Sequence, residues 1–464
     1  MSYEEHIARK GIVVPLAGFD AIEDRAWLYP FQRDTVAWAL NLGRSAIFAD
    51  TGLGKTRMQL AWASRVVESL RVEGRSPTVL LLAPLAVGAQ TVREAGRVGL
   101  GDVRLVRSQD DVSDGINVVN YDVLHKFNLP AFGGVVLDES SILKSYTGTT
   151  KRALVEGCKD VPYRLACTAT PAPNDHLELG NHAEFLGIMS SHQMIARWFI
   201  SDQSEMGTYR LKGHAVRSFW DWVASWARCI GVPSDIGPYS DAGYVLPKLD
   251  VRLHHVAVDI VDGRSDGALF REIELSATSI HREKRRTAGE RAARVAELVR
   301  AEPSESWLVW CETNYEAEAL AAVLPDAVEV SGDMTPDVKA DRLLGFAERG
   351  GILVTKPKIA GFGMNWQNCA RIAFVGGSYS YEAFYQAVRR CWRFGQPREV
   401  VCHVVMATTE AAMWRVVHGK SEAHGEMKQS MFAASRRAAA RAAATIDYHP
   451  THVAPLPAWL ESMP

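Results

Sequence analysis

One glycine-rich run combines residue types that bind phosphate groups. It reads Ala49-Asp50-Thr51-Gly52-Leu53-Gly54-Lys55-Thr56 and stands between an apolar run and a helical pattern. In that context Gly52 and Gly54 let backbone N–H groups curl around phosphate. Lys55 would reach the terminal phosphates, and Thr56 would bind magnesium. The run therefore predicts a site for ATP and Mg²⁺, although Ala49 replaces the first glycine of the usual pattern and a structural turn is the alternative.

A pair of acidic residues ends a second apolar run. Val135-Val136-Leu137 leads directly to Asp138 and Glu139. A buried strand would carry both carboxylates to the carboxyl edge of a parallel sheet, where α/β proteins bind ligands. There we expect Asp138 to share the magnesium with Thr56, and Glu139 to orient or deprotonate an attacking water. A turn or a helix cap is the alternative, but the phosphate loop upstream favours catalysis.

A third polar group lies far downstream, in a part of the chain with no phosphate loop of its own. Gln386, Arg390 and Arg393 recur at spacings of four and three residues, so we expect them on one face of a helix. Planar guanidinium groups can neutralise charge that develops on a transferred phosphoryl group. The arginines are therefore expected to complete the ATP site from a second lobe, with a solvated surface as the alternative.

The elements that would position these residues form two sets. Short β-branched or apolar runs alternate with helical patterns, which indicates α/β units on parallel sheets. The runs of the first set are 45–50, 78–84, 116–121, 134–139 and 163–170. The runs of the second set are 307–313, 327–333, 351–355, 371–376 and 400–407. The predicted fold class is α/β with two tandem domains, each built on a parallel sheet.

These sets divide the chain into five expected parts. They are an N-terminal segment at 1–24, a first lobe at 25–194, a mostly helical connector at 195–286, a second lobe at 287–420, and a C-terminal helix and tail at 421–464. Segment 283–300 has the apolar spacing of an amphipathic helix. Segment 427–446 is alanine-rich and predicted to be helical. Its basic residues would form a solvated face or contact phosphates.

Bulk composition is that of an ordinary globular protein. Of 464 residues, 47% are hydrophobic and 23% are charged, which argues against disorder. The formal net charge is -2, so any nucleic-acid site must be a local basic stripe. The seven cysteines include no C-x-x-C pair, which predicts a reducing compartment and no zinc site. No signal-peptide pattern or membrane-spanning apolar run is present, so we expect a cytoplasmic protein without membrane partners.

Taken together, these residues resemble the Swi/Snf-type DNA translocases of helicase superfamily two, over most of residues 25–410. The motifs occur in the family order. In lobe one they are Leu28 to Gln32, the loop at Lys55, Ala83-Pro84, Asn120-Tyr121, Asp138-Glu139, and Thr168 to Pro171 followed by Asn174, Glu178-Leu179 and Phe185-Leu186. In lobe two they are Gly361, Gly363, Asn365 and Gln367, and then Gln386 to Gln396.

The resemblance implies two tandem RecA-like domains that close on ATP and move along nucleic acid, with duplex DNA as the expected track. It implies catalytic roles for Gln386, Arg390 and Arg393. It also implies that Gln32 contacts the adenine base and that Gly363 belongs to the nucleotide site. The family pattern assigns nucleic-acid contact, or its coupling to hydrolysis, to Pro84, Asn120, Tyr121, Thr168, Thr170 and Asn365.

The same resemblance points to a compact, monomeric motor of a bacterium or a virus of bacteria, open to a recruiting protein partner. Three positions depart from the family. Ser141 stands where the Asp-Glu-Ala-His box has histidine, Arg389 replaces a usual glycine, and Trp366 replaces an aliphatic residue. The departure at Ser141 leaves the coupling between hydrolysis and motion open.

Two other functions would use many of the same residues. A strand-separating helicase on DNA or RNA needs the two lobes and an additional wedge. An ATP-gated clamp would grip nucleic acid or a protein without moving along it. The clamp is disfavoured by Glu139, since a clamp has no need of a water-activating carboxylate.

Overall fold

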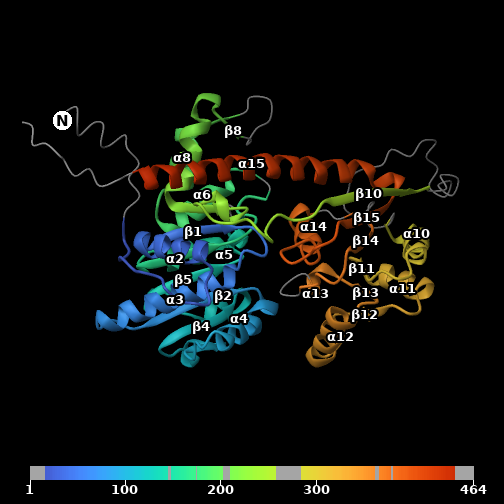
Figure 1. Ribbon diagram of the computed structural model, residues 1–464, viewed down its shortest axis with the longest axis horizontal. Coiled ribbons are helices and arrows are strands. Elements are labelled where there is room, and N and C mark those ends of the chain that lie inside the picture. Colours follow the sequence, from blue (N-terminus) through green and yellow to red (C-terminus); the bar gives the residue numbers. More distant parts are fainter. Residues whose placement is uncertain are drawn as a thin grey trace, which may run out of the picture.

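Two parallel β-sheets, one in each half of the chain, organise the protein (Figure 1). The computed structural model describes residues 16–144, 148–173, 175–201, 209–257, 284–360, 365–377 and 380–444. All strand pairs described in these two sheets are parallel. The α/β class predicted from the sequence is confirmed, and the two sheets are consistent with tandem RecA-like domains.

The sheet of lobe one has the order β3-β4-β2-β5-β6-β1-β9 among the described residues. Its strands are β1 (Arg44–Ala49), β2 (Thr78–Ala83), β3 (Val103–Leu105), β4 (Gly115–Asn120), β5 (Gly134–Asp138), β6 (Tyr163–Cys167) and β9 (Ala227–Ile230). The helices are α2 (Pro30–Leu42), α3 (Lys55–Val72), α4 (Leu85–Arg97), α5 (Thr149–Gly157) and α6 (Glu178–Leu186), with short turns η1 (Gln109–Asp111), η2 (Tyr121–Lys126), η3 (Leu129–Ala131) and η4 (Ser140–Lys144).

The sheet of lobe two has the order β10-β15-β14-β11-β13-β12 among the described residues. Its strands are β10 (Leu249–Val256), β11 (Trp307–Trp310), β12 (Val328–Val330), β13 (Ile352–Thr355), β14 (Arg371–Val375) and β15 (Val400–Ala407). The helices are α10 (Ala288–Ala301), α11 (Asn314–Val323), α12 (Pro336–Arg349), α13 (Pro357–Ala360) and α14 (Tyr381–Val388). Every run predicted in the two sets contains a strand.

The segment between the sets is mixed, whereas the sequence predicted a mostly helical connector. Its described residues contain the end of α7 (Ser191–Trp198), the antiparallel pair β7 (Phe199–Ser201) and β8 (Tyr209–Leu211), the turns η5 (Gly213–Ala215) and η6 (Pro233–Asp235), and α8 (Val216–Trp226). β9 then pairs with β1 and β10 pairs with β15. The connector therefore supplies an edge strand to each sheet. Both strands escaped prediction because charged residues and histidines interrupt their apolar pattern.

A long C-terminal helix, α15 (Ala411–Ala444), follows η8 (Thr408–Glu410) and lies across both lobes (Figure 1, red). It contacts α14 in lobe two and α8 and β9 in lobe one. Trp414 is part of the core of lobe two, whereas Met427 and Met431 are part of the core of lobe one. The prediction began this helix only at residue 427, since Gly419 and Gly425 weaken the helical signal before that point.

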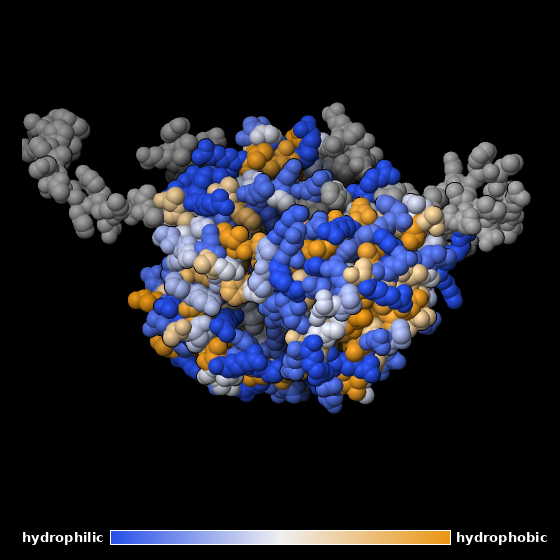
Figure 2. Space-filling model, turned by 45° about the vertical axis from the view of Figure 1, so that its right-hand side comes forward, coloured by the Kyte–Doolittle hydropathy of each residue, from blue (hydrophilic) through white to orange (hydrophobic). Residues whose placement is uncertain are grey.

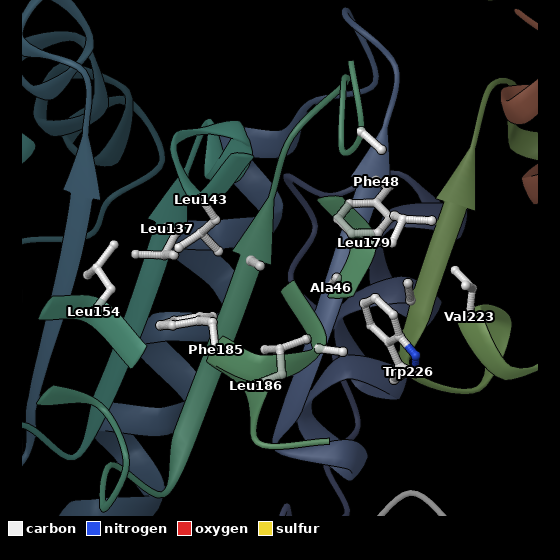
Figure 3. Close-up of a cluster of buried hydrophobic side chains, with 14 of the residues drawn as sticks. Ala46, Phe48, Leu137, Leu143, Leu154, Leu179, Phe185, Leu186, Val223 and Trp226 are labelled. Atoms are coloured by element: carbon white, nitrogen blue, oxygen red, sulfur yellow. The ribbon is translucent and has the colours of Figure 1, made fainter. Parts of the chain in front are cut away.

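The core of lobe one lies between its sheet and the helices α5, α6 and α8 (Figure 3). Ala46 and Phe48 of β1 and Leu137 of β5 face Phe185 of α6 and Trp226 of α8. All five side chains are buried. Their packing fixes the strands whose carboxyl ends carry the phosphate loop and the acidic pair.

The surface carries no large continuous apolar region on the face drawn in Figure 2, where hydrophobic residues are scattered among hydrophilic ones. Across the described residues, no helix is both long and apolar enough to cross a membrane. In the same part of the chain, no cluster of three or more His, Cys, Asp or Glu side chains is arranged to hold a metal ion. The seven cysteines are buried and free.

Phe185→Ala should lower the free energy of unfolding of lobe one by about 3–5 kcal/mol, because it leaves a cavity beneath the sheet. The control is Val72→Ala at the end of α3, where Val72 is 89% exposed. That change should cost within about 0.5 kcal/mol. Denaturant unfolding monitored by circular dichroism measures both. Equal unfolding curves for the two variants would contradict the assigned core.

Candidate nucleotide site between the two lobes

The glycine-rich run forms a loop between β1 and α3. Gly52 and Gly54 have φ angles of 95° and 80°, in the left-handed region that favours glycine. α3 begins at Lys55 with Gly54 as its N-cap, so its unpaired N–H groups face the loop. Lys55 Nζ donates to the backbone oxygens of Ala49 at 2.9 Å and Asp50 at 3.4 Å. This arrangement is that of an anion-binding loop.

The acidic pair lies at the end of β5, at the edge of the sheet beside this loop. Asp138 Oδ1 accepts a hydrogen bond of 2.7 Å from Gln59 Nε2. Glu139 has a φ of 51° and is the one non-glycine residue with a positive φ among those described. A backbone in this region is uncommon for such a residue and marks a position held by its surroundings. Thr168 Oγ1 donates to Glu139 Oε2 at 3.2 Å, which helps to hold it.

Burial and charge shift the ionisation of these groups. Burial raises the pKa of Asp138, against the lowering effects of the Gln59 hydrogen bond and the charge of Lys55. Burial also raises the pKa of Glu139, with Lys55 opposing the shift and Asp138 adding to it. Burial lowers the pKa of Lys55, although Glu139 and Asp50 oppose this. A carboxylate with a raised pKa is a stronger proton acceptor, so Glu139 is suited to be a base.

A cavity of about 200 Å³ brings the two lobes together around these residues. From lobe one it is lined by Thr51, Gly52, Gly54, Lys55, Thr56, Val87, Gln90, Asp138, Glu139, Ala169 and Thr170. From lobe two it is lined by Asn365, Tyr385, Gln386, Arg389, Arg390 and Arg393. Phosphate-loop residues and arginines distant in sequence thus share one cavity.

The arginines do not lie on a helix, so the predicted helical face was wrong. α14 ends at Val388, and the chain then turns. The carbonyl of Arg390 accepts a hydrogen bond of 2.9 Å from Trp366 N, and Gln396 Nε2 donates to the carbonyl of Cys391 at 3.3 Å. Trp366 from a distant segment and Gln396 from the same turn therefore bind carbonyl groups that a continued helix would use.

Arg390 and Arg393 remain cations in this cavity. Burial lowers the pKa of Arg390 to about 10, although the charge of Glu139 opposes the shift. Burial lowers the pKa of Arg393 to about 10 as well, and the positive charges of Arg390 and Arg389 add to the effect. Arg393 Nη1 donates to Asn365 Oδ1. Desolvated cations side by side favour an anionic ligand.

Gln32, expected to contact the adenine base, does not line the cavity. It is buried, its Nε2 donates to Leu53 O at 2.8 Å and its Oε1 accepts from Tyr29 N at 2.9 Å. In this structure Gln32 therefore ties the start of α2 to the phosphate loop. Gly363, expected in the same site, lies outside the described residues, as does Asn174.

The residues expected to contact nucleic acid fall into two groups. Pro84 follows β2 and Asn120 ends the neighbouring strand β4, where Asn120 is paired with Ala83. Thr168 and Thr170 are instead buried near Glu139 and the cavity. Tyr121 connects the groups, because its hydroxyl donates to Asp138 O at 2.7 Å.

Ser141, the departure in the acidic box, is buried, and its neighbour Ser140 contacts a histidine from another element. Ser140 Oγ lies 3.1 Å from His182 Nε2 of α6. Burial lowers the pKa of His182 to about 4, so the imidazole is neutral near pH 7. A histidine thus stands beside the acidic segment although the box itself has none. No local sequence pattern predicts this contact, since positions 140 and 182 meet only in the fold.

The residues present fit a nucleotide with a divalent cation. Thr56 and Asp138 both line the cavity and offer the oxygen ligands that Mg²⁺ prefers. Thr170 Oγ1 is buried and has no hydrogen-bond partner within the protein, although it belongs to the cavity wall. A buried polar atom of this kind is usually satisfied by a ligand or water.

A cluster at Asp50 escaped the sequence analysis. Asp50 Oδ1 accepts from Tyr385 Oη at 2.6 Å and lies 2.7 Å from Arg389 Nη2. Arg389 also donates to Thr51 O at 3.1 Å. Side chains of lobe two therefore contact the phosphate loop directly. Two features of the sequence could have pointed to this cluster, the carboxylate inside a glycine-rich loop and the unusual residue Arg389. A single sequence does not show that the two are paired.

No protein-family model matches this chain, and no curated protein does. Among solved structures, the chain is similar to the Sulfolobus solfataricus SWI2/SNF2 ATPase core in complex with dsDNA, with a TM-score of 0.41 and 15% sequence identity. The match covers 91% of this chain and 96% of that chain.

Gly52→Ala should disturb the contact between the lobes. A Cβ on Gly52 would lie 2.8 Å from Phe394 Cβ and 3.1 Å from Phe394 N, so the turn of lobe two must shift. The matched control is Gly74→Ala, which shares a positive φ but has nothing within 4 Å of the added Cβ. Both variants carry about 1 kcal/mol of backbone strain, and Gly52→Ala should lose about 1–3 kcal/mol more.

Thermal unfolding and a titration with ATP and Mg²⁺ measure the difference. We expect weaker nucleotide binding in Gly52→Ala alone. Identical behaviour of the two variants would show that Phe394 does not press on the loop.

Proposed function

We propose that this chain is an ATP-driven motor that hydrolyses ATP between two RecA-like lobes and uses the cycle to move along nucleic acid, with duplex DNA as its track. The observation that carries the proposal is the shared cavity. Lys55, Asp138 and Glu139 enter it from lobe one, and Arg390 and Arg393 enter it from lobe two. A site divided between two domains makes hydrolysis depend on their closure.

The chemistry follows from the positions of the side chains. Lys55 and the backbone N–H groups of the loop bind the phosphates. Glu139, whose pKa is raised mainly by burial, accepts the proton of the attacking water. Arg390 and Arg393 offset the negative charge that grows on the transferred phosphoryl group.

Thr56 and Asp138 would hold Mg²⁺. When bound, the ion supplies charge neutralisation at the phosphate oxygens. Both residues lie on the cavity wall of lobe one, so lobe one can bind the nucleotide before lobe two closes. Hydrolysis still requires the arginines of lobe two. This order separates binding from turnover.

The case for nucleic acid rests on the motif resemblance and is supported by a surface at the carboxyl ends of β2 and β4. Pro84 and Asn120 are neighbours there, and His125 and Lys126 are exposed on the adjoining turn η2. The same region contains Tyr121, whose hydroxyl binds the backbone of Asp138. A nucleic-acid strand bound on this surface would thus be separated from the catalytic carboxylates by one residue, Tyr121.

The direct test is the ATPase rate with no nucleic acid, duplex DNA, single-stranded DNA and RNA, each at stated salt. We expect stimulation by duplex DNA, little dependence on base sequence, and weaker binding as salt rises. Glu139→Gln is the control for contaminating ATPase and should keep ATP binding with less than about a tenth of the turnover. Stimulation by single strands or RNA alone would favour a strand-separating helicase, and a rate indifferent to nucleic acid would refute the motor.

Arg390→Ala and Arg393→Ala should each abolish stimulated turnover, by about 10³-fold, while ATP binding to lobe one persists. Arg393→Lys should also fail substantially, because lysine lacks the planar fork that meets two phosphate oxygens. The matched control is Arg398→Ala, which removes an arginine of the same segment that pairs with Glu305. Single-turnover hydrolysis and nucleotide titration separate the two effects. Normal stimulated rates in both alanine variants would refute a site shared by the lobes.

A further inference from the structure

The strongest unassigned feature is a largely buried cluster of charges on the phosphate loop. Asp50 carries one negative charge, and two cations approach it. Arg389 Nη2 lies 2.7 Å and Lys428 Nζ 3.4 Å from Asp50 Oδ1. The side chains of Asp50, Arg389 and Lys428 are 19%, 3% and 15% exposed. The sequence motifs predict no role for Asp50, and for the basic residues around Lys428 they predict only a solvated face or contact with phosphates.

Tyr385 connects the members of this cluster. Its hydroxyl donates to Asp50 at 2.6 Å and accepts from Lys428 Nζ at 2.8 Å. The ammonium of Lys428 also lies 4.7 Å from the centre of the Tyr385 ring, within the range of a cation–π contact. Lys428 therefore has three contacts that hold it in one place.

The partners of Asp50 belong to different parts of the structure. Tyr385 and Arg389 belong to lobe two, so opening of the lobes would take them away. Lys428 lies on α15 next to Met427 and Met431, which pack in the core of lobe one. Farther along α15, Ser435 Oγ accepts from Cys229 N of β9 at 3.0 Å, and Arg436 pairs with Asp235 at 2.8 Å. This part of the helix is built into lobe one.

We propose that Lys428 is a positioning residue of the nucleotide site, the resident counter-ion of Asp50 that keeps the phosphate loop in place when lobe two moves away. A buried carboxylate without a counter-ion is costly, and relief of that cost would deform the loop. Lys428 does not line the nucleotide cavity, so it acts through Asp50. Arg389 and Tyr385 then reach a carboxylate already held in position.

The inference rests on the proposed function for its kinetic consequences. Removal of Lys428 should leave the closed state intact, since Arg389 and Tyr385 hold Asp50 there. In the open state, ordering the loop when ATP binds should cost free energy. The predicted signature is a higher KM for ATP with little change in kcat. Arg390 and Arg393 variants should show the opposite.

The experiment compares Lys428→Met, Lys428→Arg and the control Arg441→Met in the full chain. Arg441 lies on the same helix and pairs with Asp221, which Arg437 also binds at 2.8 Å. Lys428→Met should raise KM at least about fivefold and change kcat less than about twofold. Lys428→Arg keeps the cation and should restore KM to within about twofold of the parent value. Arg441→Met should leave both constants unchanged.

Hydrogen exchange without nucleotide provides a readout independent of turnover. Amides of residues 50–56 should exchange faster in Lys428→Met than in Arg441→Met, because the loop opens locally more often. In an Asp50→Asn background, where no carboxylate needs a counter-ion, Lys428→Met should have little further effect on exchange or KM.

Several results would overturn the inference. They are equal KM and equal exchange in Lys428→Met and Arg441→Met, a loss confined to kcat, or an undiminished effect of Lys428→Met in the Asp50→Asn background. A wild-type protein without ATPase activity would refute the proposed function. The exchange measurement would then still decide the role of Lys428, with faster exchange at 50–56 supporting it.

Discussion

Buried charge at the junction of the two lobes is the constraint on which the rest of the structure depends. Lys55, Arg389, Arg390 and Arg393 reach one cavity, and burial is the largest influence on the pKa of each. Cations removed from water at such short range cost free energy unless anions accompany them. The acidic residues of lobe one offset part of that cost. A polyphosphate would offset more, so binding and closure favour each other.

The two sheets hold these charged groups in a fixed geometry. Buried apolar strands place the phosphate loop after β1 and the acidic pair after β5 at one edge, and the core around Phe185 and Trp226 fixes their separation. Lobe two presents its arginines on a turn held by Trp366 and Gln396. Both halves of the cavity are therefore rigid locally, and the freedom left to the system lies between the lobes. The proposed motor would use this degree of freedom.

Local patterns in the sequence were enough for the strands and for the residues of the phosphate loop, because a buried parallel strand is a short apolar run and glycine spacing is visible directly. Features made by distant segments were not accessible. The helix expected through Arg390 and Arg393 ends at Val388, and the Arg390 carbonyl accepts its hydrogen bond from Trp366, a residue distant in sequence. The histidine near Ser140 comes from α6. Pairing of Asp50 with Arg389 required both sheets to be in place.

Helix α15 limits how the two lobes can move relative to each other. Its start packs in lobe two around Trp414, and its later part packs in lobe one around Met431, so the lobes are tied at both ends of one element. A tie of this kind limits how far they separate and keeps their effective concentration high. The cost of rejoining is then small, and under the proposed function the energy of ATP binding is available for ordering the catalytic groups. Lys428 of α15 lies beside Asp50. The charged side chains at Asp50 therefore respond both to the separation of the lobes and to the position of the phosphate loop.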